Sequence, residues 1–288
     1  MNRQLTVNGF TYQAEYADAL VEHTLLPLLF RLDVMQKRKG RRILVFLAAP
    51  PAVGKSTLVA FLAALGGERG IAVQGAGLDG FHFPNAYLRS HVRMPDGTVA
   101  ALSPAENNGN TSALAGNEGR LFRRSNAALY AAAPAQGWNQ RGDRLPGSDA
   151  SPVCLAAIKG SPETFDTGAF REKLRELMEG GPVRWPVYDR RKHEPLRDAA
   201  LLAENIILIE GNWLLLAEEP WMEIRRTFAD LAIFATANPE ILRERLISRK
   251  MRGGSTRAAA ETWYETTDGP NIRRVMEHSA EADITLRL

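Results

Sequence analysis

The chain of 288 residues contains a single cysteine, Cys154. One cysteine excludes an internal disulfide and any cysteine-rich zinc site, and it fits the reducing environment of the cytoplasm. None of the five histidines stands at a spacing typical of metal ligands. We therefore expect a cytoplasmic protein that folds around a hydrophobic core, without cross-links or a structural zinc ion.

Long apolar runs are also absent. The longest, at residues 43–49 and 205–211, are far shorter than the roughly 20 residues that a membrane-spanning helix needs. The first residues, MNRQLTVNGF, are too polar for a signal peptide. We therefore expect a soluble protein with no membrane partner.

Charge of one sign does not accumulate either. The chain has 36 Lys and Arg against 33 Asp and Glu, a net charge of +3. A nucleic-acid-binding surface usually needs a basic stripe with interleaved aromatic residues, and none appears. We expect no nucleic-acid partner, whereas a small anion such as a nucleotide is compatible with this charge.

Strand and helix patterns alternate along most of the chain. Continuous apolar runs predict buried strands at residues 41–48, 72–78, 205–211 and 230–237. Helical spacing of apolar residues predicts helices within residues 17–37, 57–65, 161–180 and 238–254. Apolar strands that alternate with helices indicate an α/β fold, a three-layer parallel sheet with helices on both faces.

We expect a single domain over residues 1–288. The Asn8-Gly9 turn signal predicts an N-terminal hairpin, which with the following helix occupies residues 1–38. Residues 96–152 are rich in Ala, Gly, Asn, Ser and Pro and show little periodicity. Because structureless loops longer than about 12–15 residues are uncommon inside compact domains, we interpret this stretch as a flexible insertion.

Residues 48–57, AAPPAVGKST, lie between an apolar strand and an apolar helix. They match the phosphate-binding pattern G-x-x-x-x-G-K-[ST] except that Ala49 takes the place of the first glycine. Both prolines precede the backbone N–H groups that would point at phosphate oxygens, so the loop can still bind a nucleotide such as ATP. The expected nucleotide-binding residues here are Ala52, Val53, Gly54, Lys55, Ser56 and Thr57. Lys55 would reach the β- and γ-phosphates, and the Ser56 hydroxyl would bind Mg²⁺.

Two acidic residues follow apolar strands. Asp79 stands just after the strand predicted at residues 72–78, and Glu210 ends the apolar run of residues 205–211. Ligands bind at the carboxyl ends of parallel strands, so Asp79 could accept a proton from an attacking hydroxyl and Glu210 could organise Mg²⁺. The alternatives are a plain Asp-Gly turn and a loop or capping glutamate.

The helix predicted at residues 238–254 carries three arginines on one face, Arg245, Arg249 and Arg252. Its apolar residues Ile241, Leu242 and Ile247 can pack inward. Such a cationic face could close over a transferring phosphoryl group. The alternative is an ordinary solvated helix surface.

The stretch RWPVYDRRKHEP gathers Trp185, Tyr188, Asp189 and His193 in an expected loop. Aromatic faces with a few polar groups suit a small-molecule pocket. A lone histidine such as His193 is more often structural.

Taken together, these motifs resemble those of the phosphoribulokinase/uridine kinase/pantothenate kinase superfamily of P-loop small-molecule kinases. The motifs are PAVGKST, DGFHFPN, KGSPETFD, WPVYDRRKHEP, IEGNWLLL and RERLISRK, with DGPN near the C-terminus. The resemblance covers nearly the whole chain except residues 96–152, and it is greatest to an uncharacterised bacterial branch described as nucleoside- or fructose-kinase-like.

The resemblance implies roles for particular residues. Asp79 would match the catalytic aspartate, Glu210 the magnesium-associated acid, and Arg249 the lid. The motif YD-x-x-x-H would place Tyr188 with Asp189 and His193 at the acceptor. The departures from the pattern are Ala49 and the insertion, and the insertion leaves the acceptor open.

The sequence therefore predicts an ATP- and Mg²⁺-dependent kinase that phosphorylates a hydroxyl of a small metabolite. The catalytic residues would be Asp79, Lys55 and Arg249, with Arg245 and Arg252 on the nucleotide. The expected acceptor pocket contains Phe81, His82, Tyr87, Tyr188, Asp189, His193 and Trp213. The alternatives are a nucleotide-hydrolysing switch, which lacks its Asn-Lys-x-Asp motif here, and a catalytically silent nucleotide-binding protein. A nucleoside, a sugar and a pantothenate-like molecule all suit such a site, and the oligomeric state stays open.

Overall fold

A computed structural model describes residues 1–7, 9–102 and 151–288. The chain divides into two compact units, residues Met1–His82 with Asp166–Leu288, and residues Phe83–Phe165. Most of the expected insertion lies outside the described residues; only its two ends, residues 96–102 and 151–152, fall within them. That residues 1–288 form a single domain stays a prediction.

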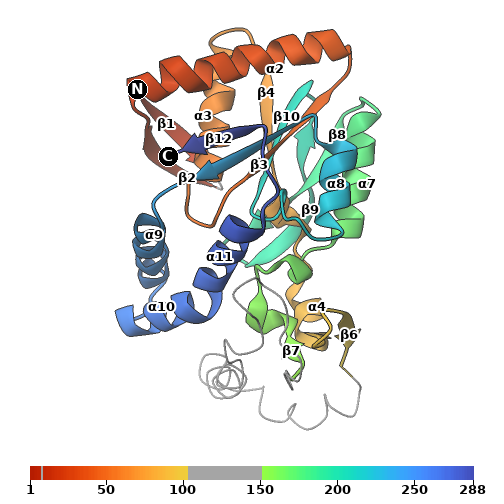
Figure 1. Cartoon of the computed structure of the whole chain (residues 1–288), viewed down its shortest axis with the longest axis vertical. Helices are drawn as coiled ribbons and strands as arrows, with labels where there is room; N and C mark the ends of the chain where they lie inside the picture. Colours follow the sequence, from red (N-terminus) through yellow and green to blue (C-terminus); the bar gives the residue numbers. More distant parts are fainter. Residues whose placement is uncertain (8, 103–150) are drawn as a thin grey trace. The chain divides into compact units, whose positions relative to one another are not determined.

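The larger unit is built on a five-stranded parallel sheet with the strand order β12-β11-β3-β10-β4 (Figure 1). Its strands are β3 (Ile43–Ala48), β4 (Val73–Gly77), β10 (Ile206–Gly211), β11 (Leu231–Thr236) and β12 (Ile284–Arg287). Every residue of β3 is buried, as the continuous apolar run predicts for a central strand. The strand begins at Ile43 rather than at Arg41, which forms an ion pair with Asp230 (2.7 Å) instead.

Helices cover both faces of this sheet. The helices of the larger unit are α1 (Asp18–Leu20), α2 (Leu26–Lys39), α3 (Lys55–Gly67), α7 (Thr167–Met178), α8 (Trp221–Phe228), α9 (Pro239–Arg252), α10 (Arg257–Trp263) and α11 (Gly269–His278). A π-helical turn, Val21–Leu25, joins α1 to α2. Along β3, Val45 and Leu47 pack in one core cluster with α2 and α3, whereas the Phe46 ring lies 6.4 Å from Phe170 of α7. The structure confirms the expected α/β sandwich of three layers.

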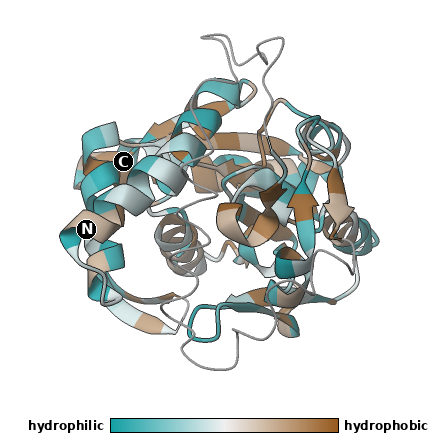
Figure 2. Ribbon diagram, turned by 90° about the horizontal axis from the view of Figure 1, so that it is seen from below, coloured by the Kyte–Doolittle hydropathy of each residue, from teal (hydrophilic) through white to brown (hydrophobic). Residues whose placement is uncertain are grey.

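Side chains cap the starts of two helices, of which the start at Asn238 is predicted by the sequence and confirmed. The Asn238 side chain accepts a hydrogen bond from the N–H of Glu240 (2.8 Å) at the start of α9. Asp166 accepts one from the N–H of Ala169 (2.9 Å) at the start of α7. Hydrophilic and hydrophobic segments alternate along the ribbons of the helices (Figure 2), as expected for helices with one face on a core.

The N-terminal hairpin and helix are present as predicted. Strands β1 (Asn2–Val7) and β2 (Phe10–Glu15) pair in antiparallel register. The Tyr12 hydroxyl lies 2.5 Å from Thr57 Oγ1, and the Tyr16 ring meets Phe61 edge-on with centroids 4.6 Å apart. The hairpin is therefore held against α3, the helix that follows the phosphate-binding loop.

The segment predicted to be a loop around residues 184–195 is a hairpin of two strands, and this prediction was wrong. Strands β8 (Val183–Asp189) and β9 (Glu194–Leu202) pair antiparallel, with a register shift between Trp185 and Val187. Pro186 and the many charged residues hide the strand pattern, and the bulge at the proline absorbs its missing N–H. The turn of this hairpin carries Arg190.

The smaller unit contains helix α4 (Asn85–Ser90) and a small sheet of the order β6-β5-β7. Its strands are β5 (His91–Arg93), β6 (Val99–Ala101) and β7 (Val153–Cys154). The N–H of Phe83 donates to the carbonyl of Thr164 (2.9 Å), so the beginning and the end of this unit are hydrogen-bonded to each other.

None of the helices among the described residues combines the length and apolar character that crossing a membrane requires.

Candidate active site

The loop between β3 and α3 turns sharply from the strand into the helix. Ala52 (φ 66°) and Gly54 (φ 104°) both adopt left-handed conformations. Such a conformation is uncommon for a residue other than glycine, so the surrounding structure must impose it at Ala52. The first turn of α3 leaves N–H groups without helical partners, and these groups with the helix dipole favour an anion at this position.

Ala49, the departure from the glycine pattern, belongs to the hydrophobic core. Its side chain is fully buried within the core cluster. Its carbonyl accepts a hydrogen bond from the Lys55 ammonium (3.2 Å). Because the methyl group packs in the core, replacing the first glycine with alanine does not fill the cradle.

Lys55 lies at the centre of the loop. Its Nζ donates to the carbonyls of Ala49 and Pro50 (both 3.2 Å) and to Oδ1 of Asn212 (2.5 Å). Burial lowers the pKa of Lys55, and the nearby carboxylate of Glu210 acts in the opposite direction. The ammonium is thus fixed in place by neutral acceptors at the carboxyl ends of β3 and β10.

Ser56 and Glu210 form a pair of oxygen donors beside Lys55. The Ser56 hydroxyl donates to Oε1 of Glu210 (2.5 Å). Burial raises the pKa of Glu210, although Lys55 and the Ser56 hydroxyl favour its charged form. A hydroxyl and a carboxylate are hard oxygen ligands of the kind that Mg²⁺ prefers, so the two residues fit a magnesium ion.

Asp79 lies in a 3₁₀ turn, Leu78–Phe81, directly after β4. Its Oδ2 accepts a hydrogen bond from Nη2 of Arg190 (2.8 Å), and the two side chains are 38% and 41% exposed. Partial burial would raise the pKa of Asp79, but the fields of His82, Arg190 and Lys55 outweigh it and lower the pKa. Asp79 is therefore a charged, accessible carboxylate.

Lys55, the Ser56–Glu210 pair and Asp79 meet at one edge of the sheet because strands β3, β10 and β4 are neighbours. Glu210 of β10 pairs with Leu47 of β3 on one side and with Gly77 of β4 on the other. The loop carrying Lys55 follows β3, and Asp79 follows β4. The structure thus brings together Lys55, Ser56, Asp79 and Glu210 as the sequence predicts.

Arg245 of α9 reaches the phosphate-binding loop. Its Nη1 donates to the carbonyls of Ala52 (3.2 Å) and Val53 (3.4 Å). Arg249 is exposed on the same helix, and its charged neighbours include Asp268, Arg190 and Asp79.

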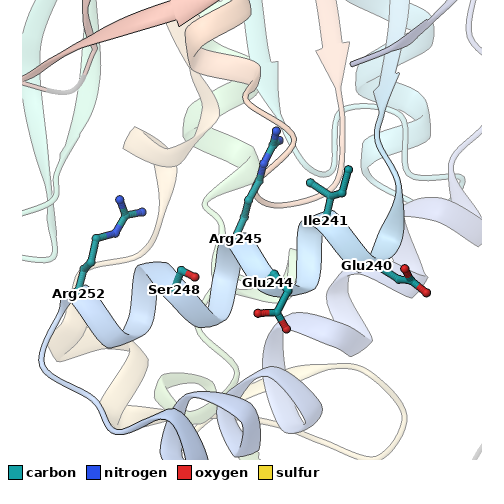
Figure 3. A pocket seen from close by; sticks show the side chains of 6 residues that line it. All are labelled: Glu240, Ile241, Glu244, Arg245, Ser248 and Arg252. Atoms are coloured by element: carbon teal, nitrogen blue, oxygen red, sulfur yellow. The ribbon is translucent and has the colours of Figure 1, made fainter.

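A hollow of about 580 Å³ lies along α9 (Figure 3). It is lined by Glu240, Ile241, Glu244, Arg245, Ser248 and Arg252. The prediction that Ile241 packs inward was wrong, because its side chain is 47% exposed and lines this hollow. Leu242 is fully buried, as predicted. The hollow places Arg245 and Arg252 on one side of the helix.

Two aromatic residues predicted for the acceptor pocket lie in the core instead. Phe81 is 4% exposed, and its ring contacts Phe170 and Trp185 with centroids 5.0 and 4.9 Å apart. Trp213 is fully buried, and the Arg274 guanidinium lies 5.9 Å from its ring centroid. The physical reason is packing, since these large rings fill the space between the sheet and the elements that cover it.

His82 and Tyr188 lie beside Asp79. Their rings are 5.3 Å apart, and the Arg190 guanidinium lies 5.9 Å from the Tyr188 ring. Burial, with a contribution from the Asp79 carboxylate, raises the pKa of Tyr188 to about 12. The tyrosine hydroxyl therefore keeps its proton at neutral pH.

Two further residues predicted for the acceptor, Asp189 and His193, lie at the β8–β9 turn. Asp189 accepts hydrogen bonds from the N–H groups of Arg191 (2.8 Å) and Lys192 (3.1 Å), which lower its pKa and fix the β8–β9 turn. His193 occupies a left-handed conformation (φ 54°) in that turn.

Tyr87 belongs to the smaller unit. Its ring stacks between those of Phe83 (4.1 Å) and His91 (3.6 Å). A role for Tyr87 in binding the acceptor stays a prediction, as it does for Asp189 and His193.

Sequence reasoning missed two polar residues, Arg190 and Asn212. Both stand inside motifs that the sequence analysis quotes, YDRRKH and IEGNW. Asn212 could have been found as the first side chain after Glu210 at the strand end. Arg190 could not, because the turn that brings it to Asp79 was read as part of a loop.

Comparisons with known proteins identify the family. The model of the Phosphoribulokinase / Uridine kinase family matches residues 158–284. The uncharacterized protein YggC of Escherichia coli is 35% identical over 291 aligned residues, which cover 100% of this chain and 96% of YggC. The chain belongs to the phosphoribulokinase/uridine kinase family of P-loop kinases. The chain is also 34% identical to a uridine kinase of Streptococcus uberis over 128 residues. This alignment covers 43% of the chain and 58% of that uridine kinase.

Solved structures agree with this family at the level of the fold. A candidate fructose transport system kinase from a Silicibacter species superposes with a TM-score of 0.63 at 24% identity, covering 91% of this chain and 98% of that one. YFH7 of Saccharomyces cerevisiae, described as a P-loop kinase with a circular permutation, gives a TM-score of 0.58 at 15% identity, with coverage of 92% and 98%. Both likenesses indicate the P-loop kinase fold.

Proposed function

We propose that this P-loop kinase transfers the γ-phosphoryl group of Mg·ATP to a hydroxyl of a small metabolite. The observation that supports this proposal best is the grouping of Lys55, Ser56–Glu210 and Asp79 at one sheet edge. Binding of Mg·ATP alone requires only Lys55 and the Ser56–Glu210 pair. An accessible carboxylate beside the loop adds a group that can accept the proton of an attacking hydroxyl.

In the proposed reaction, the acceptor oxygen forms a bond to the γ-phosphorus while the bond from that phosphorus to the β–γ bridging oxygen breaks. The hydroxyl proton passes to the Asp79 carboxylate, and ADP leaves with the bridging oxygen. Lys55 and the loop N–H groups stabilise the charge on the phosphate oxygens. Arg249, with Arg245 and Arg252, adds positive charge from α9.

Magnesium would be bound by the Ser56 hydroxyl and Glu210 together with phosphate oxygens, and it would neutralise charge on the phosphates. In the described part of the chain, no three His, Cys, Asp or Glu side chains converge into a metal site of their own. Mg²⁺ at such sites is usually bound by one or two protein oxygens together with substrate phosphates and several waters.

The proposal is tested by measuring ADP release from Mg·ATP with a panel of hydroxyl-bearing metabolites. We expect one acceptor to raise ADP release well above the rate without acceptor. Lys55→Ala and Asp79→Asn should each lower kcat/KM for that acceptor at least about 100-fold. Lys37→Ala, which changes an exposed lysine of α2, serves as the matched control and should retain the activity.

Two results would contradict the proposal. If ADP release depended on no acceptor but the protein hydrolysed ATP rapidly, the chain would be a nucleotide-hydrolysing protein. If Asp79→Asn retained full turnover with a true acceptor, the assignment of the proton acceptor would be wrong.

A further inference from the structure

We propose that the acceptor of this kinase is itself an anion, a small hydroxylated acid or phosphate ester, and that Arg190 binds its charged group. This inference rests on the proposed kinase activity and names the class of its substrate. It starts from the bond between Nη2 of Arg190 and Oδ2 of Asp79 (2.8 Å).

Arg190 has binding capacity beyond that bond. A guanidinium carries five N–H donors in a planar fork. Within the residues that the structure describes, the contact with Asp79 is the one hydrogen bond of this side chain, which is 41% exposed. Its remaining donors are therefore available to an incoming oxyanion, which a guanidinium binds through two parallel hydrogen bonds.

A permanent bond from Arg190 would oppose the proposed chemistry of Asp79. A positive charge on a carboxylate stabilises its ionised form and makes it a weaker proton acceptor. An anionic acceptor resolves this conflict, since its charged group would draw Arg190 toward itself while its hydroxyl binds Asp79. A neutral acceptor offers the arginine no such partner.

The position of Arg190 favours the acceptor over the nucleotide as its ligand. Two of the cations on the nucleotide side are bonded to the phosphate-binding loop, and one of them is Lys55, which donates to the carbonyls of Ala49 and Pro50. Arg245 likewise bonds the loop carbonyls.

Arg190 instead comes from the β8–β9 turn. It lies near the ring of Tyr188, which in turn lies near His82. These aromatic neighbours lie beside Asp79, and aromatic faces with a few polar groups suit the binding of a small organic molecule.

The geometry also limits the size of the acceptor. A hydroxyl bonded to Asp79 and an oxyanion bonded to Arg190 would lie roughly 4–8 Å apart, since each hydrogen bond spans about 3 Å. The charged group therefore stands only a few covalent bonds from the reacting hydroxyl. This describes short hydroxy acids and phosphorylated small polyols rather than large molecules with a remote charge.

The test compares matched neutral and charged acceptors in the ADP-release assay. The first set is glycerol, D-glycerate and glycerol 3-phosphate, and the second is fructose, gluconate and fructose 6-phosphate. We expect kcat/KM for the best charged member to exceed that of its neutral counterpart by about 100-fold, in line with bidentate binding of an ionised group. The carboxylate and phosphate members show which oxyanion the site takes.

Variants then connect the preference to Arg190. Arg190→Met should raise KM for the charged acceptor about 10–100-fold and remove the preference over the neutral one, with KM for ATP unchanged. Arg190→Lys should show an intermediate loss, because it keeps the charge without the fork. Arg191→Met is the matched control, since Arg191 is an exposed neighbour in the same turn and its backbone N–H, which donates to Asp189, is kept in the variant.

Binding is measured in parallel by calorimetry on the protein saturated with Mg²⁺ and a non-hydrolysable ATP analogue, with malonate and inorganic phosphate as probes. Weaker binding of these anions to Arg190→Met than to the wild type supports the inference. Equal binding overturns it, with or without turnover.

Phosphorylation of a neutral acceptor in preference to its charged counterpart would overturn the inference and leave the proposed kinase function intact. So would a higher KM for ATP in Arg190→Met with the acceptor preference retained, because Arg190 would then bind the nucleotide. Failure of the kinase function itself has a different signature, ADP release that no acceptor accelerates.

Discussion

At the scale of single residues, Asn212 explains how Lys55 is held. The lysine ammonium donates to Oδ1 of Asn212 (2.5 Å), its shortest hydrogen bond. An amide oxygen fixes the ammonium without neutralising it, whereas a carboxylate at that place would compete with phosphate for the charge. Asn212 is thus a positioning residue in the proposed mechanism.

Asn212→Ala should lower kcat/KM about 10–100-fold, the range expected for the loss of one hydrogen bond to a charged group. Steady-state kinetics with varied Mg·ATP would measure it. The control is Asn205→Ala, which changes an exposed asparagine just before the other end of β10. A full-rate Asn212→Ala enzyme would show that the loop alone places Lys55.

A second prediction at this scale concerns pH and Asp230. Its carboxylate is 4% exposed and accepts hydrogen bonds from Lys39 (2.5 Å), Arg41 (2.7 Å) and the N–H of Leu44 (2.9 Å). Burial by itself would raise the pKa of Asp230, but these bonds outweigh burial and lower it. Because the folded pKa is depressed, the stabilisation is complete above the unfolded pKa of about 3.9 and is lost as pH falls through the folded value.

Asp230→Asn should therefore lower the free energy of unfolding by about 2 kcal/mol at pH 7. The difference from the wild type should shrink as pH falls below about 4, where the Asp230 carboxyl of the unfolded chain takes up a proton, and it should vanish at the lower pH where the folded carboxylate is protonated too. Denaturant unfolding at several pH values measures this. Asp33→Asn, which breaks an i,i+4 pair with Lys37 on the surface of α2, should cost only about 0.3–0.5 kcal/mol.

At the scale of elements, the turn that carries Asp79 is pressed against strand β8. A Cβ atom added to Gly80 would lie 2.2 Å from the carbonyl oxygen of Pro186 and 2.9 Å from the N of Val187. Glycine is therefore required here by the close approach of two backbones. The contact links the position of Asp79 to the same hairpin that carries Arg190.

Gly80→Ala should lower both stability and activity, because the turn must move away from β8. We expect the free energy of unfolding to fall by about 1–3 kcal/mol, as for other overpacked sites. We also expect kcat to fall more than in variants of equal stability loss far from the site. Gly67→Ala is the control, since an added Cβ at Gly67 meets no atom within 4 Å. Equal kcat in the two variants would show that the position of the turn that carries Asp79 does not affect turnover.

The elements also show how far the sequence predicts this structure. The sheet strands were predictable because burial on both faces gives continuous apolar runs, as in β3 and in residues 206–209 of β10. The hairpin β8–β9 was not, because β9 is largely exposed and the proline and charges of β8 break the alternation.

The candidate site divides in the same way. Lys55, Ser56, Asp79 and Glu210 stand at fixed offsets from strands and could be placed from the pattern alone. The pairing of Arg190 with Asp79 depends on the register of the hairpin, which no local pattern specifies. The burial of Phe81 and Trp213 likewise depends on packing between distant segments.

At the scale of the whole molecule, nucleotide binding should stabilise the fold. A ligand at about 100 times its dissociation constant adds about 2.7 kcal/mol to the free energy of unfolding. For a chain of this size we expect Mg²⁺ with a non-hydrolysable ATP analogue to raise Tm by about 5 °C. Thermal unfolding followed by circular dichroism would measure the shift.

The same measurement on Lys55→Ala should show little of this shift, and chelation of Mg²⁺ should reduce it in the wild type. Lys37→Ala should respond as the wild type does. If the Tm of the wild type did not change when Mg²⁺ and the ATP analogue were added, this would argue against the phosphate-binding role of the loop.

The smaller unit begins at Phe83 and ends at Phe165, and the backbone segments at its beginning and its end lie next to each other. The N–H of Phe83 donates to the carbonyl of Thr164, and one step further along, the N–H of Asp166 donates to the carbonyl of Phe81 (2.8 Å). Segments inserted between neighbouring backbone positions can be exchanged or shortened without re-threading the host fold. We therefore expect that the segment between Phe83 and Phe165 could be replaced or shortened, in evolution or by design, without a change in the sheet or the phosphate-binding loop.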